Sequence, residues 1–275
     1  MIDDNYSHQN HTLMYVTESV PGPPENSKHY NQIVEDFNSQ LTKKCDCNNL
    51  CELPCCPCVK QSDGSNYVPS LDTDILYLNE SKLKDGVMGP ILECNDLCSC
   101  SYNCGNRLVQ RGPHKSLYVG MSCNEKKGLG LFCNNFIQKG TFVCEYAGEV
   151  ITKAQAISRQ PPNIVNKEMN YIFCLNEHSV SGISQTFVDP SEFGNIGRYA
   201  NHSCDPNCVI VPVRVNIPIP KLALFACKDI PPHSEVTFHY GSPDRTSDLV
   251  EEDVVQKKCL CGTAKCKGWM PYQKF

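Results

Sequence analysis

The sequence has no long apolar run, no recognisable secretion signal and no excess of basic residues. None of its apolar stretches approaches the roughly 20 residues that are needed to span a bilayer. Its first residues lack the charged and apolar regions of a signal peptide. The formal net charge of −5 argues against a dedicated nucleic-acid-binding protein, which is usually basic. We therefore expect an intracellular protein of one large or two small domains, whose mild acidity suits a basic substrate.

Cysteine is the residue type that stands out, with 20 in 275 residues. Such a content is typical either of a secreted disulfide scaffold or of intracellular metal sites. Most of these cysteines fall into tight groups with short spacings, several of them Cys-x-Cys. That spacing suits two thiolates on one metal better than bridges between distant segments. Together with the missing secretion signal, it predicts zinc sites.

A polar stretch at residues 198–207 reads Arg-Tyr-Ala-Asn-His-Ser-Cys-Asp-Pro-Asn. Asp-Pro and Pro-Asn favour tight turning, and a polar turn between apolar strands is usually a surface loop. Here it is followed by apolar runs at 209–211 and 222–226, and then by Glu-Val-Thr-Phe-His-Tyr-Gly at 235–241. This order resembles the signatures of the SET-domain lysine methyltransferases, in which the first stretch threads under a loop formed by the second. The resemblance implies a mainly β fold with short helices, a knotted β-clip of small sheets flanked by zinc-cysteine modules.

The cysteines at 45–58 and 94–104 resemble the pre-SET region of the Su(var)-type enzymes, where nine cysteines hold a triangular cluster of three zinc ions. Three tetrahedral zinc ions need twelve zinc–sulfur bonds, which nine thiolates supply if three of them bridge two metals each. The family's spacing leaves Cys55 as the spare among the ten cysteines present. Independent or partly filled sites are the alternative. The implied ligands are Cys45, Cys47, Cys51, Cys56, Cys58, Cys94, Cys98, Cys100 and Cys104.

The C-terminal cysteines Cys259, Cys261 and Cys266 lack a fourth tetrahedral ligand of their own. In the family the fourth comes from the central stretch, which here implies Cys204. A zinc ion held in this way would tie the C-terminal tail onto the active site.

The expected domains are an N-terminal extension (1–40), a pre-SET three-zinc module (41–109), a SET catalytic domain (110–241), a linker (242–258) and a post-SET zinc module (259–275). The extension is polar without periodicity, so we expect it to be loosely ordered and to lie against the later domain. Residues 152–159 predict a short helix with Thr152 near its cap. By the resemblance, this helix and residues 163–169 form the variable insert that shapes substrate choice. Strands are predicted at 117–119, 130–132, 141–146, 170–176, 210–214, 221–226 and 235–240.

The resemblance implies S-adenosylmethionine (SAM) as the methyl donor. Gly128-Leu129-Gly130 stands at the family's G-x-G, where a residue without a Cβ lets the backbone approach the cofactor. Taken alone, such a pair of glycines is usually a hairpin turn, and Leu129 replaces the tryptophan common there. His202 could instead be a satisfied core histidine, and Trp269 a packing residue. The implied SAM contacts are Lys127, Gly128, Leu129, Tyr171, Arg198, Asn201 and His202, with Trp269 covering the adenine or the lysine channel.

The implied reaction moves a methyl group from a sulfonium to a lysine amine. The amine must first lose a proton, and its free pKa is about 10.4, so a dry channel and the sulfonium charge must favour the neutral form. The resemblance gives Tyr240 the key hydroxyl beside the amine and Tyr146 the second, with water rather than tyrosine removing the proton. Phe238 stands at the position that tunes product state, where phenylalanine implies di- or trimethylation.

These features predict a histone H3 lysine methyltransferase, acting in the nucleus on chromosomes, with the H3 tail or the nucleosome as partner. The nine-cysteine module favours the ninth lysine of the tail. The alternatives are the thirty-sixth lysine, a non-histone lysine, or a catalytically silent chromatin scaffold. No membrane association and no sequence-specific DNA binding are expected. His239 replaces the common aspartate before Tyr240, and Asn176 stands where an acidic residue could pair with a basic tail.

Overall fold

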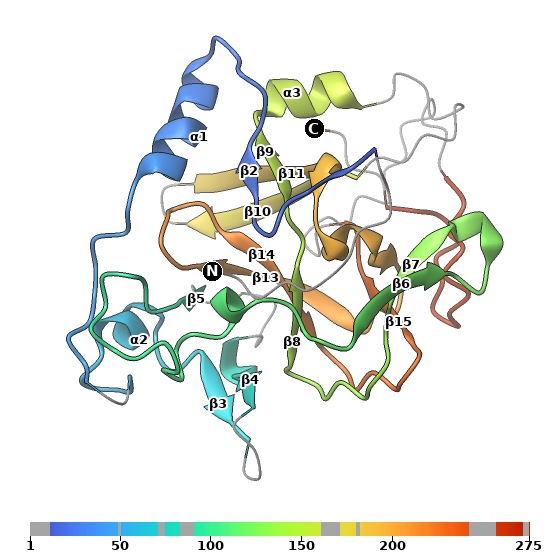
Figure 1. The fold of residues 1–275 in the computed structure, drawn as a ribbon. Helices are drawn as coiled ribbons and strands as arrows, with labels where there is room; N and C mark the ends of the chain where they lie inside the picture. The colour runs from blue at the N-terminus through green and yellow to red at the C-terminus, as the bar shows by residue number, and fades with distance from the viewer. Residues whose placement is uncertain are drawn as a thin grey trace.

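The computed structural model describes residues 12–48, 51–70, 75–82, 91–160, 171–179, 182–241, 257–271 and 275. Within these residues the regular structure is mostly β, arranged in three sheets of four or five strands and one two-stranded ribbon (Figure 1). No helix among them is both long and apolar enough to cross a membrane. The expected fold class, mainly β with short helices, is confirmed. The predicted insert at 163–169 and most of the predicted linker lie outside the described residues.

The central sheet separates two hydrophobic cores. Its middle strand, β14, has side chains that alternate between the two sides, as the two-residue period of a strand requires. Leu222 and Leu224 pack into the larger core, while Ala223 and Phe225 pack into the smaller one. Because both faces are covered, the strand is apolar from Leu222 to Ala226. The sheet contains β5 (Ile91–Leu92), β13 (Cys208–Arg214), β14 (Lys221–Ala226) and β8 (Phe142–Glu145), in that order.

A second sheet brings together the two signature segments. Its order is β12-β15-β7-β6, with β12 running parallel to β15 and the other pairs antiparallel. The predicted strands near 117, 130 and 235 are confirmed, although Leu129 already belongs to a strand and Gly128, at φ 76°, forms the turn. The strands are β6 (Leu117–Met121), β7 (Leu129–Cys133), β12 (Asn201–His202) and β15 (Glu235–Phe238).

The N-terminal extension is more ordered than its sequence predicted. Two short segments of it add parallel strands to the third sheet, and a helix follows whose Ile33 and Phe37 pack against the larger core. The backbone bonds Val16 N–H to Gly194 O (3.0 Å) and Gly22 N–H to Val150 O (2.9 Å) hold it there. This sheet has the order β1-β11-β9-β2, with β10 paired to β11. The elements are β1 (Met14–Tyr15), β2 (Val20–Pro21), α1 (Lys28–Asn38), β9 (Gly148–Ile151), β10 (Phe173–Ser179) and β11 (Gly182–Gly194).

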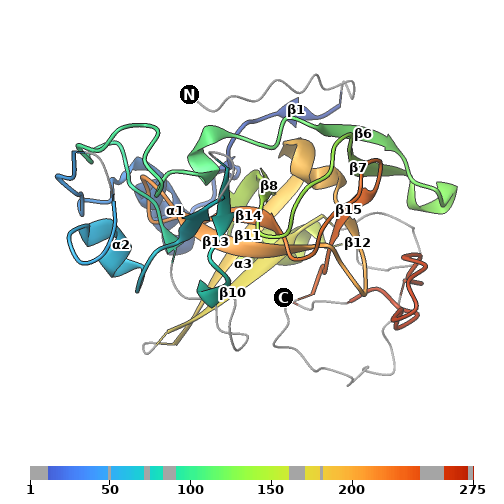
Figure 2. The same ribbon diagram turned by 90° about the horizontal axis from the view of Figure 1, so that it is seen from below.

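The remaining elements of the fold are short. Figures 1 and 2 both place the cysteine-rich pre-SET segment, around α2, at one end and the β6–β7–β15 sheet at the other. The predicted helix near 152 is confirmed as α3, with Thr152 and Gln155 forming a capping box. The elements are α2 (Pro57–Gln61), β3 (Tyr67–Pro69), β4 (Leu76–Leu78), α3 (Lys153–Arg159) and 3-10 turns at Val109–Arg111, Glu125–Lys127 and Ile196–Tyr199.

Candidate active site and zinc centres

The two signature segments lie side by side in the second sheet. Asn201 pairs with Thr237 and His202 with Phe238 along the parallel β12–β15 ladder. The Asn207 side chain links the two segments, because it accepts from Thr237 N–H and donates to Glu235 O, both at 2.8 Å. Residues about 30 positions apart are thus locked together, in the threaded arrangement that the sequence predicted.

The three predicted catalytic residues meet in one aromatic group. Phe238, only 2% exposed, lies with its ring centroid 5.5 Å from Tyr146 and 4.8 Å from Tyr240. Phe173 of β10 completes the group, 5.9 Å from Phe238. The two phenol groups are held by backbone carbonyls: Tyr146 donates to Tyr171 O at 2.5 Å, and Tyr240 to Ala200 O at 2.9 Å. The arrangement fixes two hydroxyls on either side of a buried apolar ring.

Burial raises the pKa of both phenols above the ordinary tyrosine value. The neighbouring acidic groups add to this effect, and the Arg198 charge opposes it only in part. Tyr146 and Tyr240 are therefore neutral at physiological pH. They can orient a substrate and accept or donate hydrogen bonds, but neither is poised to remove a proton as a phenolate.

Glu235 organises the predicted cofactor loop, a role that the sequence reasoning did not assign. Its carboxylate accepts from Lys127 Nζ at 2.5 Å and from Asn201 Nδ2 at 2.7 Å. Asn201 also donates to Leu129 O at 3.0 Å. A Cβ on Gly130 would lie 2.6 Å from the Glu235 carboxylate and would displace it, so glycine at this position leaves room for the Glu235 contacts. The sequence signal was the position of Glu235 at the start of the second signature.

The loop before Gly130 leaves space for a ligand. Among the described residues, no heavy atom lies within 4 Å of the place where a Cβ on Gly128 would stand. Leu129 is exposed beside it. A close backbone approach by a small molecule is thus sterically open here, as the predicted SAM site requires.

Two other predicted cofactor residues contact each other. The Arg198 guanidinium lies over the Tyr171 ring, 4.6 Å from its centroid, and 5.1 Å from that of Tyr199. Such stacking is a favourable cation–π arrangement. Trp269 lies in the post-SET segment, bridged to Lys258, and its indole is 51% exposed. Its contact with a cofactor stays a prediction.

His202 is buried between the catalytic segment and the post-SET cysteines. Its Nδ1 accepts from Tyr240 N–H at 3.2 Å, and its Nε2 lies 3.5 Å from Cys204 Sγ. Burial, helped by the neighbouring charges of His239 and Lys127, lowers the pKa of His202 to about 4. The ring is therefore neutral at physiological pH.

The nine predicted pre-SET ligands gather into one cluster. Cys45, Cys51 and Cys94 form its centre, with Sγ–Sγ distances of 3.7, 3.8 and 3.7 Å. Around this triangle the sulfurs fall into overlapping sets of four, each set spanning no more than 4.8 Å. The sets are Cys45-Cys58-Cys94-Cys98, Cys45-Cys51-Cys94-Cys100 and Cys45-Cys47-Cys51-Cys56.

This overlap matches three zinc ions sharing the central thiolates. Each pair of central sulfurs would serve one metal, and two outer cysteines would complete each tetrahedron. Cys104 is in none of the three sets, but it is buried against Cys51 and Cys94, where it would be the outer partner of Cys100. Cys55 is exposed and belongs to none of the three sets. The donor set therefore fits the predicted shared cluster, with Cys55 as the spare.

The post-SET cysteines meet the central stretch as predicted. Cys204, Cys259, Cys261 and Cys266 bring their sulfurs within 4.8 Å of one another, and Cys204 lies 3.8 Å from Cys259. Four thiolates at this spacing suit a structural zinc ion. The quartet joins the C-terminal tail to the residues that follow Asn201 and His202.

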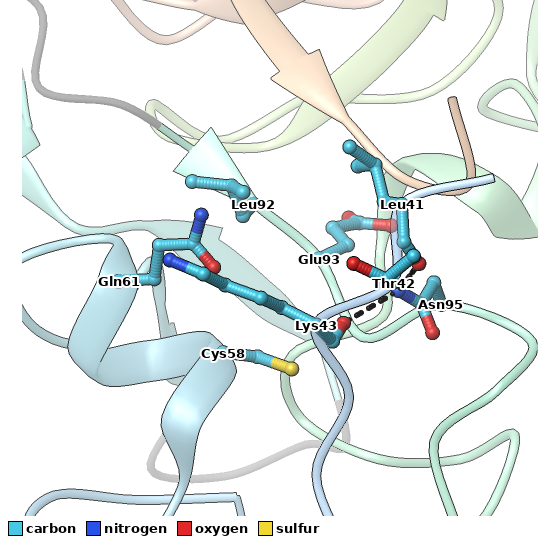
Figure 3. Close-up of a pocket in the computed structure, with 8 residues that line it drawn as sticks. All are labelled: Leu41, Thr42, Lys43, Cys58, Gln61, Leu92, Glu93 and Asn95. Atoms are coloured by element: carbon cyan, nitrogen blue, oxygen red, sulfur yellow. Dashed lines mark hydrogen bonds between the residues drawn. The ribbon is translucent and has the colours of Figure 1, made fainter. Parts of the chain in front are cut away.

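A hollow beside the pre-SET cluster is separate from the methyl-transfer residues. Figure 3 shows that the Asn95 side chain binds the backbone of residues 41–43 there, donating to Lys43 O at 2.9 Å and Leu41 O at 3.1 Å. Its lining contains none of the predicted catalytic or SAM-binding side chains, so we assign it no chemistry. The lining residues are Leu41, Thr42, Lys43, Cys58, Gln61, Leu92, Glu93 and Asn95.

Comparison with known proteins identifies the family. The Pre-SET motif matches residues 2–107 and the SET domain matches residues 128–241. The chain is 40% identical over 232 residues to the histone-lysine N-methyltransferase SETMAR of Mus musculus, covering 80% of this chain and 72% of that protein. The chain therefore belongs to the pre-SET and SET family of histone-lysine N-methyltransferases, and it is a SAM-dependent protein-lysine N-methyltransferase.

Solved structures agree with this family. The methyltransferase domain of human SETMAR superposes with a TM-score of 0.74 at 33% identity, covering 98% of this chain and 92% of that one. The structure of KRYPTONITE in complex with mCHH DNA, an H3(1–15) peptide and SAH superposes with a TM-score of 0.69 at 25% identity. It covers 94% of this chain but only 48% of that longer one.

Proposed function

We propose that this chain methylates a lysine of the histone H3 tail, on nucleosomes in the nucleus. The observation that carries the proposal is the buried ring of Phe238 flanked by Tyr146 and Tyr240, with centroids 5.5 and 4.8 Å away. These residues place two hydrogen-bonded hydroxyls beside a buried apolar ring. Such surroundings suit a long aliphatic side chain that ends in an amine, and they favour the neutral, nucleophilic form because a charged ammonium is disfavoured there.

We assign the ninth lysine of the tail as the main target. The nine-cysteine module supports this choice, as does the H3(1–15) peptide held by the related KRYPTONITE structure. Phe238 offers no hydroxyl to hold a water molecule beside the amine. The space it leaves supports di- or trimethylation.

SAM, when bound, supplies the activated methyl group. Lys127, Gly128 and Leu129 would hold it through the loop that Glu235 and Asn201 organise, with Tyr171, Arg198 and His202 closing the site and Trp269 covering it. The protein's remaining contribution is alignment, which brings the amine nitrogen into line with the methyl group. Tyr146 and Tyr240 orient the lone pair and accept weak C–H contacts, and the proton leaves to water.

We further propose three zinc ions in the pre-SET module at 41–109 and one in the post-SET module at 259–275. The SET domain would span 110–241, after the extension at 1–40, with a linker at 242–258. The overlapping cysteine sets support the count of three, and the quartet with Cys204 supports the fourth. Their role is structural, because segments this short bury little apolar area without a metal.

A transfer assay tests the function. Labelled SAM is supplied with recombinant nucleosomes or free H3, and the product lysine is located by mass spectrometry. We expect label on H3 that a Tyr240→Phe variant loses. Label on lysine thirty-six alone would overturn the choice of site, and label on no histone despite SAM binding would point to a non-histone substrate. Absence of SAM binding would favour a silent scaffold.

A further inference from the structure

The His202 ring has a different partner on each nitrogen. On one side Nδ1 accepts the Tyr240 backbone N–H at 3.2 Å. Because Nδ1 is the acceptor, it cannot carry the proton of a neutral imidazole, and Nε2 must do so. That Nε2–H lies 3.5 Å from Cys204 Sγ, an ordinary distance for a nitrogen–sulfur hydrogen bond.

Cys204 is the only member of its quartet that comes from the catalytic stretch rather than the C-terminal tail. It receives a second donor, the Lys267 backbone N–H at 3.4 Å. A zinc-bound thiolate needs such donors, because they offset its charge and fix the direction of its lone pairs. His202 and Lys267 supply them from the two segments that the metal would join.

We propose that His202 is a positioning residue that couples the post-SET zinc to Tyr240. Its Nε2–H orients the Cys204 thiolate while its Nδ1 holds the backbone amide of Tyr240. Binding of the tail zinc and placement of the Tyr240 hydroxyl therefore depend on one buried ring. The inference rests on the proposed post-SET zinc and gives His202 a role besides its predicted contact with SAM.

The packing around the ring supports a fixed orientation. His202 is almost fully buried, and its ring makes edge contacts with His239 at 4.9 Å and with Tyr240 at 5.4 Å. The β12–β15 ladder fixes its backbone opposite Phe238. The side chain has little freedom to exchange its two partners, so a disturbance at Cys204 is transmitted to Tyr240.

Two amide substitutions separate the two halves of this role. The amide of asparagine stands near the position of Nδ1, so His202→Asn keeps an acceptor for Tyr240 but loses the donor to Cys204. The longer glutamine places its amide near Nε2, so His202→Gln keeps the donor and loses the acceptor. The wild type and both variants are purified as the full chain. Elemental analysis counts the zinc ions in each protein, and a chromogenic chelator follows the release of zinc.

We expect the two variants to differ in zinc affinity and in whether added zinc restores turnover. His202→Asn should weaken binding of one zinc ion by about 10–100-fold, with the other three unchanged, and excess zinc should restore much of its turnover. His202→Gln should keep the wild-type zinc affinity but lose turnover that zinc does not restore. Unchanged affinity for every zinc in His202→Asn would overturn the coupling. A wild-type protein that holds only three zinc ions would overturn the post-SET zinc as well. The zinc count of the wild type therefore distinguishes a failure of the coupling from a failure of the proposed zinc site.

A measurement on the wild-type protein does not depend on how the variants fold. Nitrogen-15 NMR of the imidazole reports which nitrogen carries the proton. We expect a neutral ring protonated at Nε2, whose Nε2–H signal shifts when a chelator removes the tail zinc. A ring protonated at Nδ1, or an Nε2–H signal that zinc removal leaves unchanged, would contradict the proposal.

Discussion

At the scale of single residues, the room left beside Phe238 should decide how many methyl groups are added. Phe238→Tyr would place a hydroxyl, and a water bound to it, in space that a methylated amine needs. We expect products to shift from di- or trimethyl toward monomethyl-lysine, measured by mass spectrometry of an H3 peptide. Phe142→Tyr adds the same hydroxyl to a buried ring of the smaller core and is the matched control. The same product ratio in the Phe238 variant and the wild type would refute the prediction.

The raised pKa values of Tyr146 and Tyr240 lead to a prediction about pH. A raised tyrosine pKa keeps the neutral phenol present to higher pH, so neither group should ionise between about pH 7 and 10. The rate should then rise with pH only as the substrate lysine loses its proton. We expect Tyr240→Phe to lower kcat by about 100-fold through lost alignment, with the same dependence on pH.

Initial rates with labelled SAM, measured across this range for both proteins, check the expectation. A fall in the wild-type rate at alkaline pH that the variant lacks would show that Tyr240 titrates there, contrary to its burial. A phenylalanine control at exposed Tyr102 should leave the profile unchanged.

At the scale of elements, Lys221 of β14 compensates the buried carboxylate of Glu145 in β8. Lys221 Nζ contacts the buried Glu145 carboxylate at 3.0 Å and also pairs with Glu18 of the extension. Lys221→Met would leave Glu145 without its cation, and removing one partner of a buried pair costs about 3–5 kcal/mol of unfolding free energy. Lys139→Met breaks an exposed pair with Glu80 and should change the unfolding free energy far less, because water already screens that pair.

Chemical denaturation of the two variants compares these losses directly. Equal losses of unfolding free energy in the two variants would mean that the Glu145 charge is compensated in another way, by water or by protonation.

The elements also show which parts of the fold a sequence can predict. Strand β14 and helix α3 were predictable because a continuous apolar run and the Thr152–Gln155 capping pattern are local signals. The strands β1 and β2 were not, because they are two residues long and are held by backbone bonds to partners more than 120 positions away. Such contacts leave no periodicity in a polar segment.

The candidate site likewise has a part that the sequence predicts and a part that it does not. The signature motifs predicted that Tyr146, Phe238 and Tyr240 would meet, and the cysteine spacing predicted the pre-SET and post-SET sets. The position of Glu235 between Lys127 and Asn201 depends on three segments that meet only in the folded chain. No spacing rule within a single segment could have assigned that role.

At the scale of the whole molecule, the pre-SET cluster is fastened to the catalytic sheets. Strand β5 pairs with β13 of the central sheet, and the buried Glu93 that follows β5 accepts the backbone N–H groups of Leu108 and Val109 at 2.8 and 2.7 Å. The pre-SET module therefore ends directly against the smaller core. Loss of the cluster should disturb the SET domain as well as its own segment.

Cysteine substitutions test this dependence and the sharing of ligands together. Cys45 belongs to all three pre-SET sets and is fully buried, whereas Cys55 is exposed and belongs to none. We expect Cys45→Ser to release more than one zinc ion, to lower the melting temperature and to reduce methyl transfer, because a metal-dependent segment unfolds without its ions. Cys55→Ser should keep the full zinc content, stability and activity. Elemental analysis and calorimetry make the comparison; loss of a single zinc from Cys45→Ser would mean separate sites rather than a cluster that shares its thiolates.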